Sequence, residues 1–154
     1  MPRKKPTWRE KLADDKGYPQ TIQLSAEQSK RWGGGTMVIP APREVDAIMR
    51  TVRKGRLISI NEIRRQLAAL HGANSACPIT TGIFAWIAAH AADEAEQEGK
   101  RRVTPYWRTL KAKGELNPKY PGGIERLRTR LEAEGHVVVQ RGKRFYVDGF
   151  QEST

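Results

Sequence analysis

The residues best suited to chemistry lie in one short segment, residues 104–108, which reads Thr-Pro-Tyr-Trp-Arg. Gly114 follows closely, and a proline and a glycine so near each other in sequence leave too short a segment for a core helix. The flat rings of Tyr106 and Trp107 could stack on a nucleic-acid base, and the guanidinium of Arg108 could bind a phosphate. The same residues suit two core aromatics whose polar edges are hydrogen-bonded. The segment alone leaves both interpretations open.

The other reactive side chains form no catalytic grouping. Three histidines are dispersed along the chain and Cys77 is the single cysteine, so no metal-ligand spacing exists. We expect neither a metal nor a cofactor. A free tyrosine phenol, with a pKa of about 10, is mostly protonated at neutral pH, and no histidine adjoins Tyr106 to activate it. An enzyme that uses Tyr106 as nucleophile or acid is nevertheless one alternative.

Composition points to an acidic polymer as partner. The chain has 154 residues, a length typical of one domain, and a formal net charge of +11. One cysteine forbids an internal disulfide and is compatible with a reducing compartment. We find no run of 18 apolar residues that would suit a membrane span. We therefore expect a cytoplasmic monomer (nucleoid-associated if bacterial) that binds nucleic acid and no membrane.

Residues 1–35 are predicted to be a basic N-terminal arm and linker. Six lysines and arginines lie within residues 1–16, with little apolar surface, which favours a solvated and partly disordered tail. A basic arm that follows a phosphate backbone is the functional alternative. Residues 18–24 could form a short extended piece, in which residues 21–24 alternate as in a strand. The three glycines at 33–35 lack the lysine and hydroxyl of a phosphate-binding loop, so we interpret them as a linker.

Residues 36–154 are predicted to form a mainly α domain with a small β hairpin. Pro42 suits the first turn of a helix, and Gly55 is expected to end that helix as a left-handed cap. Its buried face repeats at helical spacing in Val45, Ile48, Met49 and Val52. Ser59 and Glu62 have the spacing of a capping box, and Gly72 closes the helix that they begin. The buried face of that helix is expected to contain Ile63, Leu67 and Leu70.

A third helix, from about residue 80 to residue 98, completes a helix-turn-helix pattern, although the intervening loop is long. Its first turn contains Thr80, Thr81 and Gly82, whose small size, hydroxyls and free amides suit contact with a DNA backbone. Its far end is acidic and is expected to point away from DNA. The residues expected to face the core are Ile83, Trp86, Ile87 and His90.

The charge reverses after this helix, since residues 100–144 contain 13 basic and 4 acidic residues. Lys111 and Lys113 belong to this stretch and are candidate DNA contacts. A fourth helix is expected around residues 124–131. Residues 137–147 have the pattern of a hairpin with a basic tip. That hairpin is either a wing that touches phosphate or a cover for the core.

The order of these features resembles the DNA-binding domain of the O6-alkylguanine-DNA alkyltransferases over roughly residues 42–137. Residues 104–108 resemble that family's active-site segment, Pro-Cys-His-Arg, and residues 131–135 resemble its Leu-x-x-Glu-Gly ending. The resemblance implies a winged-helix fold that binds double-stranded DNA. Tyr106 and Trp107 stand where the family has its acceptor cysteine and activating histidine. Ile79 or a neighbour stands where it has an intercalating arginine, and Ile60 where it has a tyrosine.

These departures argue against alkyl transfer. With them, the chain resembles the alkyltransferase-like proteins, which lack the acceptor cysteine. That resemblance implies a non-enzymatic protein that senses alkylated or flipped guanine and works with a DNA-repair partner. The predicted DNA contacts are Thr80, Thr81, Gly82, Tyr106, Trp107, Arg108, Lys111 and Lys113. A module for RNA or protein binding on the same fold is the other alternative.

Overall fold

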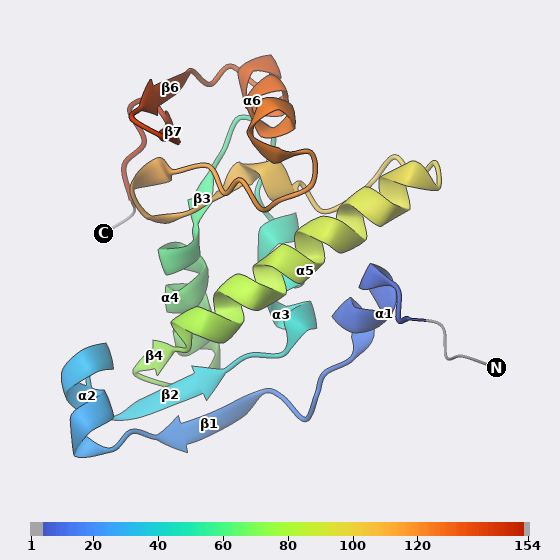
Figure 1. Ribbon diagram of the computed structural model, residues 1–154. Helices are drawn as coiled ribbons and strands as arrows, with labels where there is room; N and C mark the ends of the chain where they lie inside the picture. Colours follow the sequence, from blue (N-terminus) through green and yellow to red (C-terminus); the bar gives the residue numbers. More distant parts are fainter. Residues whose placement is uncertain (1–4, 153–154) are drawn as a thin grey trace.

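Helix α5 runs through the middle of the computed structural model, which describes residues 5–152 (Figure 1). Helices α3 and α4 pack against it, and α1 packs near its C-terminal end. In the view of Figure 1, the strands β1, β2 and β4 lie below α5, and α6 with the hairpin β6–β7 lies above it. The elements, in chain order, are α1 (Trp8–Ala13), β1 (Gln20–Gln23), α2 (Ala26–Trp32), β2 (Thr36–Ile39), α3 (Pro42–Arg50), β3 (Ile58–Ser59), α4 (Ile60–His71), β4 (Ser75–Ala76), α5 (Pro78–Gln97), the 3₁₀ turn η1 (Tyr106–Arg108), β5 (Thr109–Leu110), the 3₁₀ turn η2 (Ala112–Gly114), α6 (Gly123–Ala133), β6 (Val138–Arg141) and β7 (Arg144–Val147).

The chain has a mixed helical fold with small sheets, with more β structure than the hairpin and the short extended piece that the sequence predicted. The described residues form three sheets, with strand orders β1-β2-β4, β3-β5 and β6-β7. The predicted hairpin is confirmed as β6–β7, which pair antiparallel from Val138↔Val147 to Arg141↔Arg144. Two of the sheets contain a two-residue strand paired in parallel with a distant segment, and such pairs leave little trace in local sequence.

Residues Trp8–Ala13 form helix α1 and pack on α5, so the predicted solvated tail is wrong for this part of the N-terminal segment. The hydroxyl of Thr7 caps α1 by accepting from the backbone of Glu10, whose side chain bonds back. The indole of Trp8 stacks on the ring of His90 with centroids 4.4 Å apart, and it meets Trp86 edge-on at 4.8 Å. These tertiary contacts stabilise a helix of six residues, which is too short to be stable alone. The predictions for residues 1–4 lie outside the described residues.

The predicted extended piece at residues 18–24 contains β1, which pairs antiparallel with β2 from Gln20↔Ile39 to Gln23↔Thr36. This sheet spans the predicted boundary between residues 35 and 36. Helix α2 lies between the two strands in sequence and was not predicted; Ser25 caps its start and Gly33 its end. Gly35 has a positive φ of 70°, and a Cβ atom there would lie 2.0 Å from Oδ1 of Asn74.

Replacing Gly35 with alanine is expected to lower the free energy of unfolding by about 2 kcal/mol. Oδ1 of Asn74 cannot move freely, because it accepts a hydrogen bond from the Thr36 backbone amide at 2.9 Å. The control is Gly33→Ala, since Gly33 also has a positive φ but no atom within 4 Å of the added Cβ. Urea unfolding of the two variants measures the difference, and equal losses would show that the contact with Asn74 contributes nothing.

Helices α3 and α4 largely follow the sequence prediction, with three corrections. Helix α3 begins at Pro42 but ends at Arg50, so Gly55 (φ 84°) lies in the turn beyond it and not at its cap. Ser59 caps α4 by accepting from the amide of Glu62, but the Glu62 side chain bonds Arg65 instead of completing a capping box. Leu70 is 65% exposed, because the core face of α4 is narrower than the sequence implied.

Helix α5 is apolar on nearly all sides over its first three turns, so its sequence did not reveal which face is buried. Ile87 is buried as predicted, whereas Ile83 is 47% exposed and not part of the core. The acidic far end is bound by arginines from two other helices: Arg9 pairs with Glu94 at 3.0 Å, and Arg130 pairs with Glu96 at 2.7 Å. These pairs fix α1 and α6 on α5 and neutralise much of its acidic charge.

Candidate nucleic-acid interface

An open groove, here called the α5 groove, lies between the first half of α5 and the residues on either side of η2. Its volume is about 480 Å³. Ile79 and Ile83, its two exposed apolar side chains, are 63% and 47% accessible. The two isoleucines make the walls of the groove apolar, and Lys111 and Lys119 give it a basic rim. Its lining residues are Ile79, Gly82, Ile83 and Trp86 from α5, Lys111 just before η2, and Asn117, Pro118 and Lys119 from the facing loop after η2.

Two ring nitrogens of α5 hold the facing loop in place. The indole Nε1 of Trp86 donates to the backbone carbonyl of Lys119 at 3.1 Å, and Nε2 of His90 lies 3.3 Å from the same oxygen. Trp8 packs on both rings from the other side, so α1 supports this contact. The backbone of Lys119 is thereby fixed, while its side chain is exposed and able to follow a polyanion.

The N-terminal end of α5 leaves donors for an anion. Pro78 occupies the first turn, and Cys77 at the cap position makes no side-chain hydrogen bond to the helix. The amides of the first turn consequently have no capping acceptor, and the helix dipole places partial positive charge beside them. Ile79, in this turn, also lines the α5 groove, so an anion here would lie next to an occupant of the groove.

The segment Lys111–Glu115 forms a tight turn that presents two lysines. The backbone amide of Lys111 donates to the carbonyl of Glu115 at 2.8 Å, and Lys113 has a positive φ of 66°. Gly114 is required here, because its φ is also positive and a Cβ atom would lie 2.7 Å from Cβ of Phe150. Both lysine side chains are exposed, and the contact of Lys111 with Glu115 is long, at 3.9 Å.

Arg108 is bound within the protein, so the phosphate contact expected from the sequence is not available to it here. Its Nε and Nη2 donate to the carboxylate of Glu134 at 2.9 Å and 2.7 Å, and its Nη1 donates to the carbonyl of Val52 at 2.7 Å. Trp107 donates its indole Nε1 to the same carboxylate at 3.0 Å. Burial opposes ionisation of Glu134, but the hydrogen bonds from Arg108 and Trp107 lower the pKa of its carboxyl below the usual value.

Tyr106 lies entirely within the core. It is 0% exposed, and its ring meets the rings of Trp107 and Tyr120 edge-on at 5.4 Å and 6.1 Å. Its hydroxyl has no hydrogen-bond partner among residues 5–152, and burial raises the pKa of the phenol. Tyr106 is thus a core aromatic, which is one of the two interpretations that the sequence left open. The hydrogen bond expected at its polar edge is not formed with any described residue. A neutral, inaccessible phenol is poorly suited to act as nucleophile or acid.

The structure brings together only part of the predicted set of contacts. Gly82 and Lys111 face each other across the α5 groove, and Lys113 lies in the adjoining turn. Thr81 is fully buried and donates its hydroxyl to the carbonyl of Cys77 at 2.6 Å. Thr80 is partly buried, and its hydroxyl oxygen is inaccessible and has no partner within the described part of the chain. The two threonine hydroxyls are therefore not exposed for phosphate contact in this arrangement.

Sequence reasoning missed most of the groove. The missed lining residues are Ile79, Ile83, Trp86, Asn117, Pro118 and Lys119. Ile83 and Trp86 were predicted to face the core. Trp86 does pack against it while also lining the groove, whereas Ile83 is exposed, since apolar spacing on α5 cannot distinguish a buried face from an exposed one. One usable signal was Gly82, a glycine within the helix that leaves space at its own position.

Two further classes of site find no support in residues 5–152. No group of three or more histidine, cysteine, aspartate or glutamate side chains in this part of the chain could hold a metal ion. No helix among the same residues is both long and apolar enough to cross a bilayer.

Comparisons with known proteins give one similar solved structure. No protein-family model matches the chain, and no curated protein matches it. The crystal structure of S. pombe Atl1 in complex with damaged DNA containing O6-carboxymethylguanine is 18% identical to this chain, with a TM-score of 0.44. The match covers 69% of this chain and 85% of that chain. At this identity and TM-score, neither membership of a family nor an activity follows.

Proposed function

We propose that this protein binds double-stranded DNA through the α5 groove and catalyses no reaction. The observation that carries the proposal is the pair of exposed isoleucines, Ile79 and Ile83, beside Lys111 and Lys119 in one groove. Proteins that bind and deform the minor groove insert apolar side chains between base steps while basic side chains bind the flanking phosphates. A net charge of +11 supplies the long-range attraction for such a partner.

The surrounding elements suit this mode of binding. Helices α4 and α5 are joined by residues 72–77, and we propose that they act as a helix-turn-helix whose second helix contacts DNA with its N-terminal half. The hairpin β6–β7 would act as a wing, since Arg141, Lys143 and Arg144 are all exposed on it. Lys113, in the turn before the groove, adds a further phosphate contact.

We further propose that the α5 groove holds a base displaced from the duplex, with alkylated guanine as the preferred occupant and DNA repair as the process served. A volume of about 480 Å³ lies in the range of small-molecule sites. Trp86 supplies an aromatic surface, and Asn117 supplies an amide that can hydrogen-bond a base edge. Tyr106, Trp107 and Arg108 support the fold around the groove in this proposal and do not contact DNA.

The test measures binding to one duplex with and without a single O6-methylguanine, across a series of salt concentrations. If about four to six phosphates are contacted, log affinity should fall against log salt with a slope of about -4 to -5. That slope together with tighter binding to the modified duplex is the expected result. The same slope without discrimination would restrict the proposal to general DNA binding. Equal or tighter binding to double-stranded RNA, or no binding to either polymer, would overturn it.

A further inference from the structure

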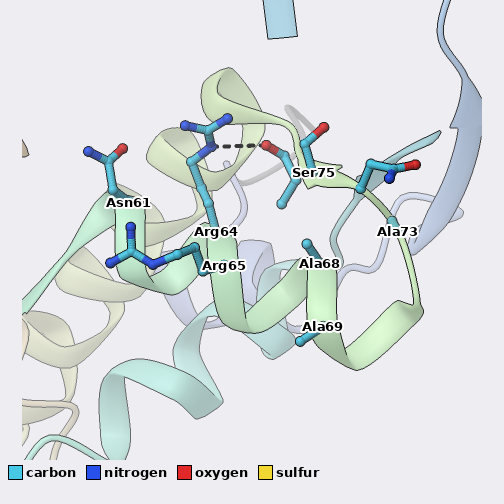
Figure 2. Close-up of a pocket in the computed structure, with 9 residues that line it drawn as sticks. Asn61, Arg64, Arg65, Ala68, Ala69, Ala73 and Ser75 are labelled. Carbon is cyan, nitrogen blue, oxygen red and sulfur yellow. Dashed lines mark hydrogen bonds between the residues drawn. The ribbon is translucent and has the colours of Figure 1, made fainter. Parts of the chain in front are cut away.

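A second groove, here called the Arg64 groove, lies along α4 and shares no lining residue with the α5 groove. Its volume is about 580 Å³. Figure 2 shows Arg64 reaching from α4 toward the strand β4, with Asn61 and Arg65 on the same helix. Its lining residues are Asn61, Arg64, Arg65, Ala68, Ala69, Ala73, Asn74, Ser75 and Ala76.

The guanidinium of Arg64 has no carboxylate partner among the described residues. Its Nε donates to the backbone carbonyl of Ala76 at 2.9 Å, which fixes the plane of the group, and neither terminal nitrogen bonds a described residue. The side chain is partly buried, and this burial lowers the pKa of the guanidinium. The neighbouring Arg65 is bound to Glu62 at 2.6 Å. Arg64 is thus a partly desolvated cation with two free donor groups.

Two other donors belong to the same groove. The hydroxyl of Ser75 is inaccessible and has no hydrogen-bond partner among the described residues. Such a group destabilises the fold when nothing satisfies it. Asn74 uses its Oδ1 to accept from the backbone of Thr36 at 2.9 Å, which leaves its Nδ2 as a donor. The carboxylate of Glu152 contacts Asn61 at 3.3 Å at one end of the groove and forms no ion pair with Arg64.

From this donor set, we propose that the Arg64 groove binds the phosphate group of a nucleotide or of a nucleic-acid strand. A planar guanidinium with two free terminal nitrogens binds two phosphate oxygens at once. Nδ2 of Asn74 supplies a donor for a further oxygen, and a rotation of the Ser75 side chain would bring its unsatisfied hydroxyl to the same phosphate. A two-oxygen carboxylate would not need these further donors. The methyl groups of Ala69 and Ala73 leave room for the rest of the ligand against an apolar wall.

The test follows backbone amide signals of residues 73–76 by NMR at constant ionic strength. Three probes are titrated: inorganic phosphate, deoxyadenosine monophosphate, and a short single strand without terminal phosphates. We expect saturable shifts with at least one probe. Arg64→Gln should abolish them, whereas Arg53→Gln, which removes the same charge at an exposed site without an ion pair in the described chain, should leave them unchanged.

The variant Ser75→Ala separates a loss of ligand binding from a loss of folding, because the substitution should not destabilise the protein. Without ligand, removing an unpaired buried hydroxyl should leave stability equal or higher. With ligand, we expect affinity to fall about fivefold, the loss of one hydrogen bond of about 1 kcal/mol. Shifts with the monophosphate but not the strand identify a free nucleotide, and shifts with the strand identify a nucleic-acid backbone. No saturable shift with any probe, or equal losses in Arg53→Gln and Arg64→Gln, would overturn the proposal and leave DNA binding at the α5 groove untouched.

Discussion

Replacing Arg108 with methionine is expected to lower the free energy of unfolding by about 3–5 kcal/mol. The side chains of Arg108 and Glu134 are only 13% and 8% exposed. Methionine fills much of the volume of the arginine stem but leaves the Glu134 carboxylate with the Trp107 indole as its one remaining side-chain donor. The carbonyl of Val52 also loses its hydrogen bond from Nη1. Denaturant unfolding measures the loss.

The matched control is Arg128→Met, which breaks an ion pair of the same kind in α6. Arg128 and Glu132 are 48% and 47% exposed, so their pair at 3.3 Å is screened by solvent. We expect that variant to change the free energy of unfolding by less than about 0.5 kcal/mol. Similar losses in both variants would contradict the structural role assigned to Arg108.

The loss in the free energy of unfolding caused by Arg108→Met should also depend on pH. The ionisation of Glu134 decides whether this loss grows or shrinks on acidification. Hydrogen bonds from Arg108 and Trp107 hold the pKa of this carboxyl below its unfolded value of about 4.3, although burial opposes ionisation. The stability that the pair supplies is therefore present above that value and is lost as the pH falls through the lower, folded pKa. We expect the difference between the wild type and the variant to shrink below about pH 4. A difference that stays constant on acidification would exclude this linkage.

The same pair shows why the sequence could not assign residues 104–108. A proline followed by two aromatics and an arginine is compatible with both a nucleic-acid contact and a core turn. The deciding partner of Arg108 is Glu134, which lies 26 residues away, and no local pattern joins them. Sequence reasoning succeeded where the determinants are local, as at Pro42 of α3, Gly72 at the end of α4 and the hairpin β6–β7.

Tertiary contacts determined the features that were missed. Helix α1 depends on Trp86, His90 and Glu94 of α5, so its own composition resembles that of a solvated tail. The exposed face of α5 depends on where the loop around Lys119 crosses it. A helix that is apolar on all sides gives no periodic signal for that choice. The groove that carries the proposed function thus follows from packing and not from any single motif.

Replacing Ile83 with glutamate is expected to weaken duplex binding at least about tenfold while leaving the fold intact. Ile83 is 47% exposed, so the substitution removes apolar surface from the α5 groove without opening a cavity in the core. The new carboxylate would lie where DNA phosphates and base edges are proposed to approach, and a tenfold loss corresponds to about 1.4 kcal/mol. Fluorescence anisotropy with one labelled duplex at fixed salt measures the change.

The control for this substitution is Leu70→Glu, since Leu70 is a 65% exposed apolar residue that does not line the α5 groove. Both variants lower the net charge by the same amount, so any loss of long-range attraction is shared. A loss confined to Ile83→Glu locates the duplex on α5. Equal losses would mean that binding depends on overall charge alone, and unchanged affinity in both would remove the α5 groove from the interface. Because neither residue belongs to the Arg64 groove, phosphate binding there should survive in both variants.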